Sequence, residues 1–390
     1  MSSINRRNFL RSSSLAVLPT LLPLAPALAA GPTQKPQAPA GPPVKFFGDG
    51  EMFAPGDYLQ MLQQVHAANA IVPDRYGSGG AVEALEKKFA EITGKEKAIY
   101  MPTGTLANQL AVAVLGGSNT KVYVQDESHY YRDEADAAQS VFQKRLMPLA
   151  KGEAYFTAQQ LQQAIESLPS EEVFGSGIGA VSIENPVRRI NGCQVPLEEI
   201  KKISEYCRSK NIKLHLDGAR LYMASAWSGV PIKEYASYFD TVYISLYKYL
   251  GASGGAILCG DKAVIDQMPH LIKVHGGTMY GNWPNAAMAL HRLEGLEFRL
   301  QEAIKRANTL FAALNKLPGV KVSAFTNGTN IYKLELDKSV DGKKLQEILI
   351  KQHNILIIPP KNNLMQLFVN ETLLYQPIET IIQAFKNSLS

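Results

Sequence analysis

A lysine and an aspartate stand beside two strand-like runs of the chain. Lys248 follows the apolar run 241–244, and Asp217 follows the run 212–216 within the sequence His-Leu-Asp-Gly-Ala-Arg. The carboxyl ends of neighbouring parallel strands meet at one edge of a sheet, where ligands bind. We therefore expect the amine of Lys248 and the carboxylate of Asp217 to face a common ligand.

An amine and a carboxylate at strand ends are the pair that pyridoxal phosphate chemistry needs. Lys248 would form a Schiff base with the cofactor aldehyde, and Asp217 would keep the pyridine nitrogen protonated, so that the ring withdraws electrons. The turn Thr103-Gly104-Thr105 lies between a predicted strand and a predicted helix. Free backbone N–H groups at such a helix start suit a phosphate, although the same turn read alone is an ordinary helix cap.

One histidine, His129, follows the strand-like run 122–124. A lone histidine is often only a structural hydrogen-bonder. In a site of this kind, however, a histidine commonly lies flat on the cofactor ring, where it can also move protons. We therefore include His129 among the expected catalytic residues, with Lys248 and Asp217.

Strand-like and helical segments alternate along most of the chain, which predicts an α/β fold with a mostly parallel, seven-stranded type of sheet. A single long helix is expected over 285–314, and a compact α+β end domain after it. The predicted strands of the sheet cover residues 98–101, 122–124, 179–183, 212–216, 241–244 and 255–258.

The composition is that of an ordinary soluble protein, with 46% hydrophobic and 19% charged residues and a net charge of +5 over 390 residues. Basic residues alternate with acids, as at 85–88, which argues against a nucleic-acid partner. The three cysteines have no CxxC spacing, and their odd number argues against a disulfide framework. Histidines and cysteines do not cluster with zinc-ligand spacing, so no metal is expected.

The N-terminus has the pattern of an export signal. Arg6 and Arg7 form a twin-arginine pair, and the apolar run 15–28 leads to small residues suited to cleavage. The run is too short and too rich in proline for a membrane span. We expect a signal peptide over 1–30, recognition by the twin-arginine machinery, and a periplasmic location without stable membrane insertion.

The remaining chain is expected to divide into three parts. Residues 31–44 are rich in Pro and Ala and predict a linker. Residues 45–295 are expected to form a large domain that binds pyridoxal phosphate, and residues 296–390 a small C-terminal domain.

Several motifs together resemble the threonine aldolase branch of the aromatic amino acid β-eliminating lyase family. The most specific is His-Leu-Asp-Gly-Ala-Arg at 215–220, followed by Thr-Gly-Thr-Leu-Ala-Asn-Gln at 103–109. Tyr-Gly at 76–77, Ile-Glu-Asn at 183–185 and Gly-Gly-Thr-Met at 276–279 agree with it. The resemblance implies a fold-type I pyridoxal phosphate enzyme, a homodimer or homotetramer with sites between subunits, and cleavage of β-hydroxy-α-amino acids to glycine and an aldehyde.

Carried over by position, the resemblance implies roles for individual residues. Lys248 is the cofactor lysine, Asp217 the pyridinium partner and His129 the ring-stacking residue. Gly104 and Thr105 bind phosphate. A last position, Arg220, would lie beside the phenolic oxygen of the cofactor and the substrate carboxylate, since its fork suits carboxylates.

Departures from the family pattern concentrate on substrate binding. Tyr247 stands where the family has Ser before the lysine, and Tyr280 stands where it has an Arg. Gln366 aligns with a second Arg of the family pattern. We therefore expect Tyr280 to contact the substrate together with Arg220, and weak binding of plain threonine unless another cation replaces the lost ones. The arginines available for that purpose are Arg75, Arg188 and Arg189.

The leading interpretation is a lyase of the threonine aldolase type, a carbon–carbon lyase. A second interpretation keeps the cofactor and changes the bond that breaks, which would give β-elimination, racemisation or transamination. A third is a protein that binds the cofactor without turnover. Intact Lys248, Asp217 and His129 argue against the third.

Overall fold

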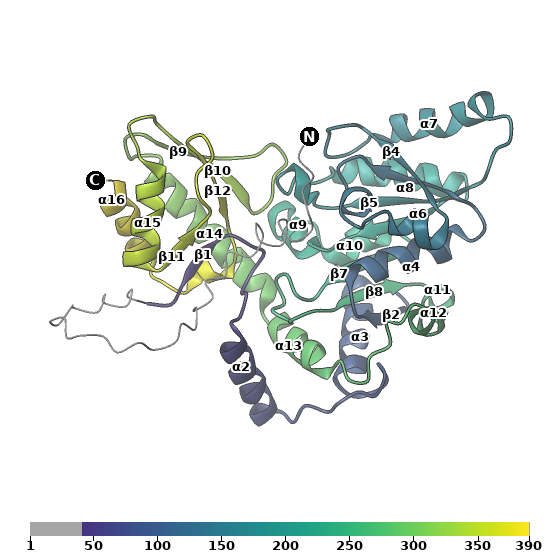
Figure 1. The fold of residues 1–390 in the computed structure, drawn as a ribbon, viewed down its shortest axis with the longest axis horizontal. Coiled ribbons are helices and arrows are strands. Elements are labelled where there is room, and N and C mark those ends of the chain that lie inside the picture. The colour runs from purple at the N-terminus through teal and green to yellow at the C-terminus, as the bar shows by residue number, and fades with distance from the viewer. Residues whose placement is uncertain (1–40, 390) are drawn as a thin grey trace, which may run out of the picture. The chain divides into compact units, whose positions relative to one another are not determined.

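The computed structural model describes residues 41–389. The expected signal peptide and most of the expected linker lie outside this range. A seven-stranded sheet dominates the described chain, with strand order β2-β8-β7-β6-β5-β3-β4 (Figure 1). Its strands are β2 (Lys97–Met101), β3 (Lys121–Gln125), β4 (Arg145–Leu149), β5 (Ile178–Glu184), β6 (Lys213–Asp217), β7 (Thr241–Ser245) and β8 (Ala256–Gly260).

Six strands of this sheet run parallel, and β8 alone is antiparallel to its neighbours β2 and β7. The expected α/β fold with a mostly parallel sheet is confirmed. Parallel strands are buried on both faces, which is why their sequences are nearly continuous apolar runs. All five residues of β7 are buried, for example.

Helices cover the sheet on two faces, and the side chains of each strand alternate between them. Val242 and Ile244 point into a core shared with α3 (Gly80–Thr93) and α8 (Leu197–Ser209). Tyr243, between them, points into the core of α4 (Gly104–Gly116). The other helices within residues 55–274 are α2 (Pro55–Ala68), α5 (His129–Arg132), α6 (Ala137–Phe142), α7 (Ala158–Glu171), η1 (Arg188–Ile190), α9 (Leu221–Ser228), α10 (Ile232–Ser237), α11 (Lys262–Ile265) and α12 (Met268–Val274).

The prediction of a single long helix over 285–314 is wrong, because two helices occupy this range. The first is α13 (Trp283–Leu293) and the second is α14 (Leu296–Leu314). Gly295 between them has a φ of 66°, a left-handed conformation that glycine adopts without steric cost and that ends a helix. His129, expected after the strand-like run 122–124, is the first residue of α5.

The C-terminal elements have a core of their own. An antiparallel sheet has the order β12-β10-β9, and β1 pairs in parallel with β11. Val44, the last residue of the expected linker, already lies in β1 and in this core. The division near residue 295 remains a prediction. These elements are β1 (Val44–Phe46), β9 (Val320–Ala324), β10 (Ile331–Leu336), α15 (Gly342–His353), β11 (Ile355–Ile357), β12 (Leu364–Phe368), η2 (Glu371–Leu374) and α16 (Ile378–Leu389).

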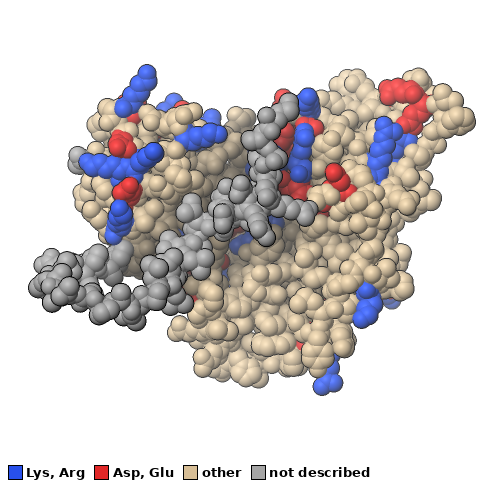
Figure 2. All heavy atoms as spheres, in the orientation of Figure 1, with Lys and Arg blue, Asp and Glu red and all other residues tan. Residues whose placement is uncertain are grey.

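Basic and acidic groups stand side by side on the surface, as Figure 2 shows for one face. On α3, Lys87 pairs with Glu83 at 2.6 Å and Lys88 with Glu91 at 3.2 Å. Both lysines lie on the solvent-exposed face of this helix. Within residues 41–389, no helix is long and apolar enough to cross a membrane.

The three cysteines, Cys193, Cys207 and Cys259, are all buried and free of disulfides. Burial raises the pKa of the Cys207 and Cys259 thiols to about 12, so both are unreactive thiols at neutral pH. Among the described residues, no group of three or more His, Cys, Asp or Glu side chains is placed to hold a metal ion.

Candidate active site

The structure brings Lys248 and Asp217 to the same edge of the sheet. Asp217 is the last residue of β6, and it is in register with Tyr243 on β7. Lys248 lies in the turn that follows β7, with its Nζ 5.9 Å from the centre of the Tyr243 ring and 5.0 Å from that of Tyr247. The shared edge is the one at which parallel strands present their carboxyl ends.

The environment of Lys248 favours the neutral amine. Burial and the positive charge of Arg220 lower its pKa, the negative charges of Asp217 and Asp49 oppose the shift, and the resulting pKa is about 8. A neutral amine is the nucleophilic form. Lys248 therefore has a substantial reactive fraction near neutral pH, which an exposed lysine does not.

Asp217 is 1% exposed and held by two donors. Its Oδ2 accepts a hydrogen bond from Asn108 Nδ2 at 3.1 Å, and its Oδ1 accepts one from the backbone N–H of Ala219 at 3.1 Å. Both oxygens are therefore held in place, which fixes the orientation of the carboxyl group.

Behind Asp217, a chain of buried polar side chains fixes Asn108. The Asn108 amide gives its two N–H bonds to Asp217 and to Glu134 Oε1, the latter at 2.9 Å. Its Oδ1 therefore accepts from His215 Nε2 at 2.9 Å, and His215 Nδ1 accepts from the Thr241 hydroxyl at 2.8 Å. Burial lowers the pKa of His215 to about 4, so the imidazole is the neutral Nε2–H tautomer.

Three carboxyl groups lie around His129. Its backbone N–H donates to Glu184 Oε2 at 2.7 Å, and its ring nitrogens lie 3.3 Å from Asp133 Oδ2 and 3.7 Å from Glu134 Oε1. Burial raises the pKa of Glu184 to about 7, and the charge of Asp217 adds to the rise. Burial also raises the pKa of Glu134 well above its usual range. The imidazole, 37% exposed, therefore lies where groups able to exchange protons meet solvent.

The first turn of α4 is fixed against β7. Thr103 caps the helix by accepting a hydrogen bond from Leu106 N at 3.1 Å. A Cβ atom at position 104 would collide with the Tyr243 hydroxyl, so only glycine fits there. The backbone N–H groups of Gly104 and Thr105 belong to the first turn, which has no intrahelical acceptors for them. The expected phosphate turn thus ends beside the strand that leads to Lys248.

Arg220 and Tyr280, the expected substrate residues, have other contacts in this chain. Arg220 Nε and Nη2 donate to the two carboxylate oxygens of Asp49, at 2.7 and 2.9 Å. Tyr280 is 64% exposed, its ring packs edge-on against Tyr76 at 5.3 Å between centroids, and its carbonyl accepts from Tyr76 N. The positive charge of Arg220 lowers the pKa of Lys248, so Arg220 belongs to the Lys248 site. The contacts of Tyr280, in contrast, are with Tyr76.

Sequence reasoning assigned no role to Asn108, Glu134, Glu184, His215 or Asp49. Signals for some of them exist in the chain. Asn108 lies one helical turn after Gly104, and His215 lies two residues before Asp217 on the same face of β6. Glu184 ends β5 in register with Asp217. The hydrogen bonds of Asn108, however, join α4 to residues of other elements, and the sequence does not show these pairings.

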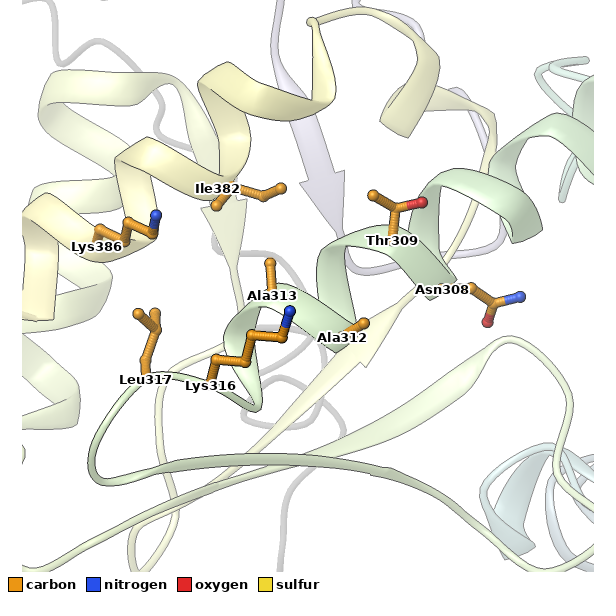
Figure 3. Close-up of a pocket in the computed structure, with 8 residues that line it drawn as sticks. All are labelled: Asn308, Thr309, Ala312, Ala313, Lys316, Leu317, Ile382 and Lys386. Atoms are coloured by element: carbon orange, nitrogen blue, oxygen red, sulfur yellow. The ribbon is translucent and has the colours of Figure 1, made fainter.

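Two surface hollows are lined by residues other than Lys248 and Asp217. The larger, about 880 Å³, lies between α14 and α16 (Figure 3). A second, about 580 Å³, is lined by α3, β2 and the segment 277–279. Neither is lined by His129, Arg220 or Glu184. The residues that line the larger hollow are Asn308, Thr309, Ala312, Ala313, Lys316, Leu317, Ile382 and Lys386.

Comparison with known families shows which family the chain belongs to. Residues 59–336 match the beta-eliminating lyase family, a range that includes every residue of the Lys248 edge except Asp49. The chain belongs to the beta-eliminating lyase family. The family depends on pyridoxal 5′-phosphate, as the arrangement of Lys248 and Asp217 predicts.

Relatives within this family carry two different names. A low-specificity L-threonine aldolase of Candida albicans is 35% identical over 54% of this chain and 56% of its own length. An alanine racemase, TOXG, of Cochliobolus carbonum is 33% identical over 50% of this chain and 49% of its own length. The chain thus spans about half of each of these two relatives. A crystal structure of a candidate L-allo-threonine aldolase from Listeria monocytogenes aligns with a TM-score of 0.74 and 25% identity, over 89% of this chain and 95% of that one.

The residues present fit the family's cofactor. Ser245, at the end of β7, has a buried hydroxyl that interacts with the Tyr243 side chain beneath the Lys248 amine. Lys248 supplies an amine with a lowered pKa, Asp217 a buried carboxylate, and α4 free N–H groups. Together these groups would hold an aldehyde, a pyridine nitrogen and a phosphate.

Proposed function

We propose that this protein cleaves the Cα–Cβ bond of β-hydroxy-α-amino acids to glycine and an aldehyde. The observation that supports the proposal best is the Lys248 amine, with a pKa of about 8, at the sheet edge shared with the buried Asp217. The threonine aldolase name of a relative 35% identical to this chain points to the same reaction.

The residues divide the work as follows. Bound pyridoxal phosphate supplies an electron sink for the bond at Cα. Lys248 would hold the cofactor through its amine, and Asp217, oriented by Asn108, would hold the pyridine nitrogen. His129, between Asp133 and Glu134, takes the proton of the β-hydroxyl group at Nε2 and releases it to solvent.

Product analysis tests this proposal. The purified protein, loaded with pyridoxal phosphate, is incubated with threonine, allo-threonine and phenylserine, and both glycine and aldehyde are measured. We expect equal amounts of the two products from at least one substrate. Formation of ammonia and a keto acid without aldehyde would instead indicate β-elimination, and an intact amino acid with no change would indicate a binding protein.

Racemisation is a second candidate, because a relative named alanine racemase is 33% identical to the chain. Proton exchange at Cα uses the same lysine and the same ring, and the orientation of the substrate selects the bond. L-alanine incubated with the loaded protein distinguishes the two. D-alanine formed faster than aldehyde from any hydroxy amino acid would favour the racemase.

We infer that the active unit is a homodimer or homotetramer. Helix α2 buries only Leu62 in the described chain, and exposed apolar residues extend over α2 and the Tyr76–Tyr280 region. Exposed apolar surface of this kind is typical of a subunit interface. Light scattering after size exclusion should give at least twice the monomer mass of 42.7 kDa, and a monomer at assay concentration would contradict it. The exposed residues are Leu59, Val72, Tyr76, Met279 and Tyr280.

We also propose periplasmic export through the twin-arginine machinery, supported by Arg6, Arg7 and the apolar run 15–28. This machinery carries folded proteins, which suits an enzyme that must receive its cofactor in the cytoplasm. Replacement of both arginines with lysine should leave the precursor in the cytoplasm with cofactor bound. Undiminished periplasmic protein in that variant would refute the proposal.

A further inference from the structure

An amino acid substrate brings a carboxylate into this site, and the arginines expected to receive it are engaged or absent. Arg220 has its Nε and Nη2 donors on Asp49. Gln366 on β12 is an amide, and it donates to Asn191 Oδ1 at 2.7 Å. Asn191 belongs to the turn that begins with η1, and this turn carries two arginines of its own.

The two arginines of that turn differ in their contacts. Arg189 Nε lies 3.2 Å from Glu127 Oε2, and its Nη1 lies 2.8 Å from Asp133 Oδ1. Arg188 is exposed, and its guanidinium makes no ion pair or hydrogen bond with the part of the chain that the structure describes. Five N–H donors of Arg188 are therefore available to a ligand.

The backbone of Arg188 is fixed at the site. Its N–H donates to Glu184 Oε1 at 3.1 Å, while the other oxygen of the same carboxylate accepts from His129 N at 2.7 Å. Glu184 is in turn the register partner of Asp217. One buried carboxylate thus places Arg188 and His129 next to each other at the carboxyl edge of the sheet.

The charge of Arg188 also acts within the site. Burial opposes ionisation of Asp49, yet its pKa stays below the usual range because Arg220, Lys248 and Arg188 lower it. Arg188 is therefore one of three cations that lower the pKa of Asp49. Of these three, Arg220 is paired with Asp49 and Lys248 is the expected cofactor lysine, which leaves Arg188 for another ligand.

The turn itself is held on both sides. Val187 N donates to Cys193 O at 2.8 Å, Gly192 N donates to Val187 O at 3.0 Å, and Thr329 Oγ1 donates to Gly192 O at 2.8 Å. With the Gln366–Asn191 bond, these contacts keep the turn in place before any ligand arrives. A pre-placed cation loses less freedom on binding than one on a mobile loop.

We propose that Arg188 binds the α-carboxylate of the amino acid substrate through its guanidinium fork. This inference rests on the proposed function and deepens it, because it assigns the group that selects α-amino acids over other amines. The contact is present in the bound substrate before the bond breaks, so it contributes to binding more than to the chemical step.

Glycine binding tests the assignment independently of turnover. Calorimetry on the loaded protein should give a glycine Kd that rises about ten- to a hundredfold in Arg188→Gln, the range for loss of a charged hydrogen-bonded contact. Glycinamide, which lacks the negative charge, should bind equally to both proteins. Arg188→Lys should recover part of the affinity. Arg145→Gln, on the exposed end of β4, is the matched control and should bind glycine normally.

Kinetics with the preferred hydroxy amino acid should show a raised KM with little change in kcat for Arg188→Gln. Unchanged glycine affinity in this variant, or a loss found in Arg189→Gln or Arg75→Gln instead, would overturn the assignment. If the wild-type protein cleaves no hydroxy amino acid while Arg188→Gln still loses its preference for glycine over glycinamide, the proposed reaction fails and the carboxylate site stands.

Discussion

Asn108 Nδ2 lies 3.1 Å from Asp217 Oδ2 and 2.9 Å from Glu134 Oε1, so a single buried amide serves two carboxyl groups. Burial raises the pKa of Glu134 well above its usual range, so this carboxyl group favours the protonated form. His215 fixes the direction of the amide from behind. The amide thus joins Asp217 to an acid with a strongly shifted pKa, and such acids are common in catalytic sites.

Asn108→Leu should impair both stability and catalysis. The substitution keeps the volume and removes the donor of Asp217 and the acceptor of His215, so buried polar groups lose their partners. We expect a loss of about 1–3 kcal/mol in the free energy of unfolding and at least a tenfold fall in kcat. Urea denaturation and steady-state kinetics measure these. Gln109→Leu, the neighbouring amide on α4, is the control, and equal effects of both substitutions would contradict the role of Asn108.

Asp217→Asn should fold and still retain part of its cofactor through the phosphate turn, but lose several orders of magnitude in turnover. A neutral amide cannot hold the proton on the pyridine nitrogen, and the electron sink weakens as a result. Circular dichroism, cofactor titration and product assays separate the three effects. Turnover near that of the wild type would show that Asp217 is not the pyridinium partner.

The capture of pyridoxal phosphate by the cofactor-free protein should accelerate as pH rises and level off above about 8. The neutral amine is the reacting form, and the lowered pKa of Lys248, about 8, places its deprotonation well below the ordinary lysine value of about 10.4. Stopped-flow absorbance across this pH range provides the profile. A rate that keeps rising to about pH 10 would mean that the lysine is not shielded as the structure indicates.

Glu86, remote from the Lys248 edge, should make stability fall as pH rises. Burial raises its pKa to about 7, while its Oε1 accepts from Tyr100 N at 2.8 Å. The folded protein holds the proton more tightly than the unfolded chain, so this stabilisation is complete below about pH 4.3 and is lost as pH passes 7. Glu86→Gln keeps an acceptor and removes the titration.

Relative to Glu86→Gln, the wild-type protein should therefore lose about 1–3 kcal/mol of unfolding free energy between about pH 5 and about pH 8. The lower end of this range is expected, because Glu86 is only partly buried. Urea denaturation at the two pH values provides the comparison. Parallel pH dependence of the two proteins would show that the Glu86 carboxyl titrates normally.

The sequence predicts the strands of this fold well and its polar contacts poorly. Runs 212–216 and 241–244 agree with β6 and β7 to within one residue at each end, because strands buried on both faces are apolar throughout. The break at Gly295 was missed, since glycine is also tolerated within a helical pattern.

The same contrast holds in the site. Lys248 and Asp217 are recognisable because their residue types follow strands directly. The bond between Asn108 and His215 joins residues 107 positions apart, and that between Arg220 and Asp49 joins residues 171 positions apart. Such pairs depend on how α4 and the segment after β1 pack against the sheet, and no local pattern encodes that.

The most direct test of the account is reductive trapping of the cofactor. The protein is incubated with pyridoxal phosphate, treated with borohydride, digested and mapped by mass spectrometry. The account predicts a yellow protein before reduction and one stably modified peptide, carrying the label on Lys248, which is absent in Lys248→Ala. A colourless protein, or a label on another lysine with Lys248 unmodified, would contradict the claim that the Lys248–Asp217 edge is the active site.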